Sequence, residues 1–201
     1  MKISIVTAAY RSNLMPIVWE SIKKQTFKNW EWIIVNDAQE EIRQWYKEFK
    51  KENPNINVWF VDIKKQKGRF GVYSRNVGAM LANYDRIIFL DDDNQWESEH
   101  LQSLVDLEKE TGKVPYCWMH VIGKQPNSNY NRIKKTGFSK QGIDLGCILW
   151  RKDLFEKYGY FRDDSQVTFD WNEMARVYYG HGPHNFICTN NPSLIFYHKR
   201  Y

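Results

Sequence analysis

Four short apolar runs, separated by stretches with helical spacing, fill the first ninety residues of this 201-residue chain. The apolar runs lie at residues 3–7, 32–35, 58–61 and 86–90, and the helical stretches at 16–25, 40–51 and 71–83. Strands that alternate with helices form a mainly parallel sheet with helices on both faces. We therefore predict an α/β, Rossmann-like fold, for which an apolar content of 42% supplies the core.

The second half of the chain is less regular and predicts a smaller, mixed C-terminal part. We expect helices at 99–111, 152–158 and 171–179, strands at 114–122, 144–150 and 193–197, and a polar loop at 123–142. A polar loop of that length is typical of a functional segment, so we interpret it as an acceptor lid. No linker divides the chain, which predicts a single domain over residues 1–201, with a nucleotide-binding half at 1–94 and an acceptor and catalytic half at 95–201.

Polar side chains stand where three of the predicted strands end. Thr7 ends the first apolar run, Asp37 comes shortly after the second, and the acidic triplet Asp91-Asp92-Asp93 follows the run at 86–90. Ligands of such sheets bind beyond the carboxyl ends of the strands, so we expect these groups to converge on one crevice. Adjacent carboxylates repel one another, and Mg²⁺ or Mn²⁺, which commonly holds a diphosphate, would offset the repulsion. The alternative is that the triplet forms a solvated turn.

The charge and composition of the chain limit its possible binding partners and its expected location in the cell. A net charge of +5 suits an anionic ligand, a nucleic acid or a membrane surface, but it is also an ordinary aid to solubility. An acidic triplet in the predicted groove argues against nucleic acid, because it would repel phosphates unless a metal were bound. The sequence has no apolar run long enough to cross a membrane, and its three widely spaced cysteines suggest neither disulfides nor a zinc site. We therefore expect a cytoplasmic protein.

Six segments in order resemble the family 2 glycosyltransferases with the GT-A fold. The matching segments are residues 4–10, 20–27, 32–37, Ser74-Arg75-Asn76-Val77-Gly78, Phe89-Leu90-Asp91-Asp92-Asp93, and Phe169-Asp170-Trp171 with Arg176. The ordered set, which runs across nearly the whole chain, is far more specific than any one segment. The resemblance implies a nucleotide-diphospho-sugar donor, most simply a UDP-sugar, a saccharide or other hydroxyl acceptor, and Mn²⁺ or Mg²⁺ as cofactor.

The resemblance also assigns roles in binding the donor. It places the nucleobase and ribose at Thr7, Ala9 and Tyr10, a base imide at Asp37, and the diphosphate at Arg75 and Asn76. Asp91 or Asp92 would face the ribose, and the metal would bind Asp93, with Asp91 and the late His198 as further ligands. Alternatives stay open: a strand–helix turn at Thr7–Tyr10, a turn or helix cap at Asp37, a surface ion pair at Arg75, and a solvated His198.

For catalysis, the resemblance implies inversion and makes Asp170 the candidate base for the acceptor hydroxyl. The position before it is Phe169 where the family usually has an acid, which keeps Asp163, Asp164 and Glu173 as substitutes, and Asp170 could instead be a helix cap. His181 and His184 are further metal candidates, and Trp96, Trp118, Trp150 and Trp171 are candidates for a sugar platform or for the core.

Rival functions also follow from the sequence. They are a sugar-nucleotide pyrophosphorylase, a catalytically inactive relative that binds the sugar nucleotide, and a nucleic-acid or polyanion-binding module. The first is disfavoured because residues 7–11 contain no glycine for a phosphate loop. The second remains open because Phe169 and Asn94 depart from the family pattern.

Overall fold

A computed structural model describes the chain except for residues 69–70, 126–127, 135–137, 139–142, 163–168 and 199–201. Its central sheet has the strand order β3-β2-β1-β4-β8, in which β1 to β4 run parallel and β8 is antiparallel. The strands are β1 (Ile3–Ala9), β2 (Trp30–Asn36), β3 (Val58–Asp62), β4 (Arg86–Phe89) and β8 (Trp150–Arg151). The predicted alternation of strand and helix and the mainly parallel sheet are confirmed.

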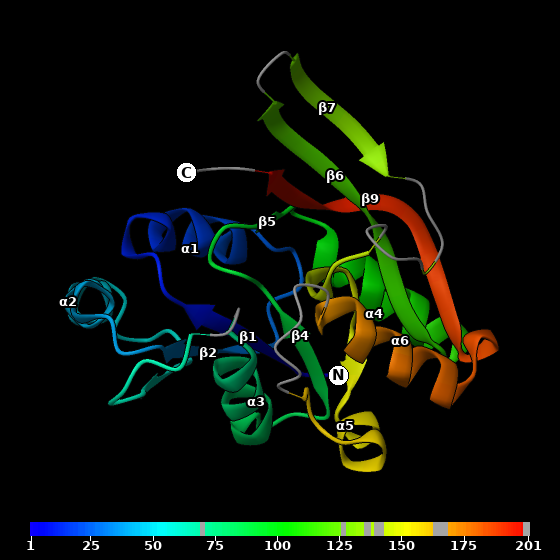
Figure 1. Ribbon diagram of the computed structural model, residues 1–201, viewed down its shortest axis with the longest axis horizontal. Helices are drawn as coiled ribbons and strands as arrows, with labels where there is room; N and C mark the ends of the chain where they lie inside the picture. The colour runs from blue at the N-terminus through cyan, green and yellow to red at the C-terminus, as the bar shows by residue number, and fades with distance from the viewer. Residues whose placement is uncertain (69–70, 126–127, 135–137, 139–142, 163–168, 199–201) are drawn as a thin grey trace.

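Helices cover both faces of this sheet. They are α1 (Met15–Lys23), α2 (Glu40–Glu52) and α3 (Val72–Leu81), and Figure 1 shows α1 and α3 on opposite sides of β1. Trp32 of β2 stacks on Trp19 of α1 and packs edge-on against Phe49 of α2, which puts both helices on one face. Within the described part of the chain, no helix combines the length and the apolar character needed to cross a membrane.

The opposite face depends on a glycine in α3. A Cβ built at Gly78 would lie 2.3 Å from Cγ1 of Val6 in β1, closer than any real contact allows. The missing side chain thus lets α3 approach β1 closely. Val6 and Trp32 lie on opposite faces of the sheet because side chains alternate along each strand.

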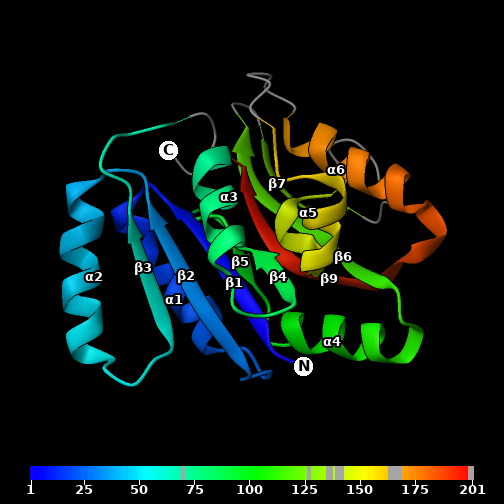
Figure 2. The same ribbon diagram turned by 90° about the horizontal axis from the view of Figure 1, so that it is seen from below.

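A second, mixed sheet has the order β5-β9-β6-β7, with β6 and β9 parallel and both outer pairs antiparallel. Figure 2 shows it beside the central sheet, with α4 on one side and α5 and α6 on the other. The elements are β5 (Gln95–Trp96), β6 (Val114–Gln125), β7 (Ser128–Lys134), β9 (Phe186–His198), α4 (His100–Thr111), α5 (Lys152–Tyr158) and α6 (Phe169–His181). The predicted smaller mixed part is therefore present.

Three predictions for the second half are wrong. Residues 123–134 are not a loop, because β6 continues to Gln125 and pairs with β7 as a hairpin; the rest of the predicted lid lies largely outside the described residues. The predicted strand at 144–150 is instead a 3-10 turn at Leu145–Cys147 followed by β8, because the Asp144 side chain accepts from the Gly146 N–H and closes the turn. The last strand begins at Phe186 and not at Ser193.

We predict that Gly78→Ala destabilises the protein by about 1–3 kcal/mol, because an added Cβ would push α3 away from β1. Met80→Ala on the same helix is the control, since Met80 is 55% exposed and should change stability little. Urea unfolding measures both. Equal stability of the two variants would show that the close packing at Gly78 does not matter.

Candidate active site

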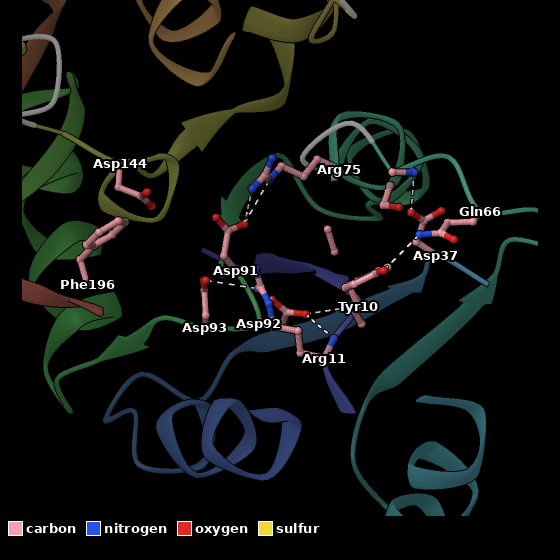
Figure 3. A pocket seen from close by; sticks show the side chains of 15 residues that line it. Tyr10, Arg11, Asp37, Gln66, Arg75, Asp91, Asp92, Asp93, Asp144 and Phe196 are labelled. Atoms are coloured by element: carbon pink, nitrogen blue, oxygen red, sulfur yellow. Dashed lines mark hydrogen bonds and ion pairs between the residues drawn. The ribbon is translucent and has the colours of Figure 1, made fainter. Parts of the chain in front are cut away.

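A pocket of about 490 Å³ lies at the carboxyl ends of β1, β2 and β4. Its size is within the usual range for small-molecule sites. The lining comprises residues 8–11 at the end of β1 and just beyond it, residues 91–93 after β4, Gly71, Ser74 and Arg75 at the start of α3, and Asp37, Gln66, Gly68, Asp144 and Phe196. Figure 3 shows the charged members of this set around the cavity.

Asp92, the middle acid of the triplet, binds the chain that follows β1. Its Oδ2 accepts from the backbone N–H groups of Tyr10 at 2.8 Å and Arg11 at 2.7 Å, and its Oδ1 pairs with the Arg11 guanidinium. The side chain is only 3% exposed, and this burial raises the pKa of Asp92 above its ordinary value, against the attraction of Arg11 and the two N–H groups. Asp92 therefore fixes the backbone of Tyr10 and Arg11 in the wall of the pocket.

Asp91 and Asp93 are more open to the pocket, at 21% and 23% exposure. The Arg75 guanidinium binds Oδ1 of Asp91 through Nε at 3.1 Å and Nη2 at 2.6 Å. Nη1 of Arg11 lies 3.2 Å from Oδ2 of Asp93. Two arginines thus offset the repulsion within the triplet, a role that the sequence analysis gave to a metal alone.

Asp37 organises the opposite end of the pocket. Its two carboxylate oxygens accept from the backbone N–H groups of Lys67 at 2.7 Å and Gly68 at 2.8 Å. Nε2 of Gln66 in the same loop donates to the Tyr10 hydroxyl at 3.2 Å. The loop after β3 therefore closes over the ends of β1 and β2, and Asp37 is a buried acceptor rather than a solvated turn residue.

The start of α3 supplies positive charge between these two ends. Gly71 precedes the helix with φ of 75°, a left-handed conformation that suits glycine, and Ser74 and Arg75 lie in its first turns. The first N–H groups of a helix and a guanidinium favour a bound phosphate. This end of α3 can therefore receive a diphosphate.

Several residues proposed from the sequence lie elsewhere. The Thr7 side chain is buried and its hydroxyl accepts from Trp32 Nε1 at 3.0 Å, on the face opposite Gly78. The Asn76 amide exchanges two hydrogen bonds with the backbone of Phe161, at 2.7 and 3.0 Å. These two side chains serve the fold in this structure, whereas Ala9 and Tyr10 do line the pocket.

The predicted catalytic acids are only partly described. Asp170 lies in the first turn of α6 and His198 is the last residue of β9, but both side chains lie outside what the structure describes, as do Asp163 and Asp164. Glu173 is fully buried and pairs with Arg162 and Arg176 at 3.0 and 2.7 Å. Arg176 also donates to the backbone oxygens of Tyr158 and Gly159, so this pair fixes α6 to the end of α5. Glu173 is thus a structural acid and a poor substitute base.

Five lining residues were not predicted from the sequence: Arg11, Gln66, Gly68, Asp144 and Phe196. Arg11 directly follows the predicted Thr7–Tyr10 loop, which is the signal that could have found it. Gln66 and Gly68 lie in or beside a basic run that reads as solvated surface, and Asp144 and Phe196 lie far away in sequence. The aromatic lining is Tyr10 and Phe196, whereas Trp96 and Trp150 are buried in the core.

Comparison with known proteins assigns the chain to a family. Residues 4–177 match the sequence model of Glycosyl transferase family 2. The chain belongs to that family. An uncharacterized glycosyltransferase of Bacillus subtilis (strain 168), YwdF, is 27% identical over 191 residues, covering 88% of this chain and 68% of the relative. One from Haemophilus influenzae is 26% identical over 190 residues, covering 87% and 61%.

Solved structures confirm the GT-A fold. S. aureus TarS 1–349 in complex with UDP-GlcNAc has a TM-score of 0.79 and 16% identity, over 100% of this chain and 60% of TarS 1–349. Mannosyltransferase PcManGT from Pyrobaculum calidifontis, in complex with GDP-Man and Mn²⁺, has a TM-score of 0.72 and 13% identity, over 99% and 58%. This chain spans about 60% of the length of these solved proteins.

The donor set at the triplet fits one mode of metal binding. Within the described residues, no three or more His, Cys, Asp or Glu side chains are grouped as a metal site. Mg²⁺ and Mn²⁺, however, are commonly bound by one or two carboxylates together with substrate phosphates. Asp91 and Asp93 supply such carboxylates beside the start of α3, while Asn94 is buried outside the lining. The residues therefore suit a metal that arrives with a diphosphate, not a preformed cage.

We predict that Asp92→Ala destabilises the protein by about 2–3 kcal/mol, because two backbone N–H donors and a guanidinium lose their buried acceptor. Asp93→Ala is the matched control and should cost under about 1 kcal/mol, since the Asp93 side chain is 23% exposed, against 3% for Asp92, and an ion pair open to solvent contributes little. Urea unfolding without metal gives both values. An equally large loss of stability in Asp93→Ala would contradict the conclusion that Asp92, and not Asp93, stabilises the pocket wall.

Proposed function

We propose that this chain transfers a sugar from a nucleotide-diphospho-sugar to an acceptor hydroxyl, with inversion and with the help of Mn²⁺ or Mg²⁺. The observation that carries the proposal is that one pocket is lined by Asp91, which pairs with Arg75 at the start of α3, and by Asp93. Such a pocket offers carboxylates for a divalent cation and N–H and guanidinium donors for a diphosphate. Family membership supports the same reaction class.

The nucleoside end is assigned to Asp37 and Tyr10. Each Asp37 oxygen has a further lone pair beyond its bond to the Lys67 or Gly68 N–H, so the carboxylate can accept from a base imide. Tyr10 is 50% exposed and offers a ring and a backbone for the base and ribose. A uracil base suits these acceptors, and the likeness to TarS in complex with UDP supports UDP as the nucleotide.

The diphosphate is assigned to the start of α3 and to the flanking acids. Arg75 is held by Asp91 and is 6% exposed, which fixes its guanidinium at the helix start without ordering cost. A metal held by Asp93 and Asp91 would stabilise the negative charge of the departing nucleoside diphosphate. His198 stays a proposed further ligand.

Asp170 is assigned the role of base. Its position in the first turn of α6 belongs to a helix that the Glu173–Arg176 pair fixes to α5, so the backbone that carries it is well supported. The carboxylate would accept the proton of the acceptor hydroxyl as that hydroxyl attacks the anomeric carbon. A single displacement inverts the configuration. Asp144 and Phe196 line the same pocket from the second half of the chain and would contact the sugar or the acceptor.

We predict that UDP raises the melting temperature, and that Mn²⁺ increases the shift, because a ligand that binds only the native state stabilises it. At a hundred times its dissociation constant the ligand adds about 2.7 kcal/mol, a shift of several degrees. Asp93→Ala should keep the UDP shift but lose the Mn²⁺-dependent part, and Asp106→Ala on exposed α4 surface should behave as the wild type. No shift with any nucleoside diphosphate would contradict the proposed function.

We predict that Asp170→Asn lowers turnover of the best-binding nucleotide sugar by about 10²–10⁴-fold, because the amide cannot accept the proton. The affinity of the Asp170→Asn variant for UDP, measured by calorimetry, should equal that of the wild type. Asp153→Asn is the control, since Asp153 is 66% exposed on α5. Turnover by Asp170→Asn at the wild-type rate would remove Asp170 as the base.

A further inference from the structure

Arg11 occupies an unusual place, because it connects the structural acid of the triplet to the acid assigned to the metal. Its backbone N–H and its guanidinium both bind Asp92, while Nη1 also lies 3.2 Å from Oδ2 of Asp93. Figure 3 shows the contact between Arg11 and Asp93 at the edge of the cavity. A cation of the protein thus lies against the same carboxylate that is assigned to a divalent cation.

We propose that Arg11 couples nucleotide binding to metal binding, by holding Asp93 in the absence of ligand and transferring its guanidinium to the diphosphate when the nucleotide binds. This inference rests on the proposed function and adds a positioning residue to it. The ligand classes are a nucleoside diphosphate and a divalent cation. The metal then binds well only to the protein that already carries the nucleotide.

Arg11 is suited to move, whereas Arg75 is not. The Arg75 side chain is 6% exposed and holds Asp91 through two nitrogens, whereas the Arg11 side chain is 33% exposed at the pocket lining. The Asp92 carboxylate keeps its backbone bonds to Tyr10 and Arg11 when the guanidinium moves, so the pocket wall stays in place. The long side chain with five donors can exchange a carboxylate for a phosphate.

The coupling follows from like charges at one carboxylate. A guanidinium and a divalent cation that share Asp93 repel each other, so the metal alone must first displace Arg11. A bound diphosphate gives Arg11 a new partner of opposite charge and removes that obstacle. By linkage, the metal must then strengthen nucleotide binding by the same factor.

The test measures Mn²⁺ binding by the electron paramagnetic resonance signal of free Mn²⁺, without ligand, with UDP and with uridine. The wild type should bind Mn²⁺ more tightly with UDP than alone, and uridine, which lacks phosphates, should have no such effect. Arg11→Gln should bind Mn²⁺ alone about tenfold more tightly than the wild type, and its gain from UDP should shrink by a similar factor. Arg11→Lys, which keeps a cation, should retain part of the coupling.

Arg43→Gln is the matched control, because Arg43 also pairs with two acids, Asp62 and Glu40, but on α2 outside the pocket lining. It removes the same charge and should leave Mn²⁺ binding unchanged. Thermal unfolding checks that each variant is folded. If Arg11→Gln is not folded, Mn²⁺ binding by Arg11→Lys is compared with that of the wild type instead. An unchanged gain from UDP in the folded Arg11 variant would overturn the inference while leaving the proposed function standing. Failure of the wild type to bind UDP, or to bind Mn²⁺ when UDP is present, would overturn both.

Discussion

The pocket depends on the hydrogen bonds and the ion pair that the Asp92 carboxylate forms with the chain after β1. It joins residues 82 and 81 positions apart, because Asp92 follows β4 while its partners Tyr10 and Arg11 follow β1. The two strands are neighbours in the sheet, so their ends already lie side by side, and the carboxylate fixes the loops beyond them. A buried acid is costly on its own, and here the N–H groups and the guanidinium compensate for lost hydration.

The fixed position of Asp92 also determines the directions in which the other two acids of the triplet, Asp91 and Asp93, point. Neighbouring residues of a turn point in different directions, so fixing Asp92 to the pocket wall leaves Asp91 and Asp93 facing the cavity. Each of these acids has an arginine beside it, Arg75 for Asp91 and Arg11 for Asp93. The pocket therefore combines negative and positive groups within a short distance, which suits a ligand that carries both a diphosphate and a metal.

Much of the fold could be predicted from the sequence, because the first half alternates apolar runs with helical spacing. The hairpin at β7 (Ser128–Lys134) was missed because its polar residues carry no strand pattern. Asp37 and the triplet were found at strand ends, as topology requires. The Thr7 side chain points toward Trp32, because successive residues of a strand point to opposite faces of the sheet, and the assignment of Thr7 to the nucleotide stays a prediction. Arg11 follows the predicted Thr7–Tyr10 loop directly and could have been found from that position, whereas Phe196 could not, since its place in the lining depends on contact between distant segments.

A crystal structure of the chain with UDP and Mn²⁺, with the metal located by anomalous scattering, tests the central claim most directly. The account predicts that Mn²⁺ is bound by the Asp93 carboxylate and the diphosphate, with the uracil at Asp37. It also predicts that Asp92 remains bonded to the Tyr10 and Arg11 backbone. A metal bound by Asp92, or a nucleotide bound away from the start of α3, would contradict it.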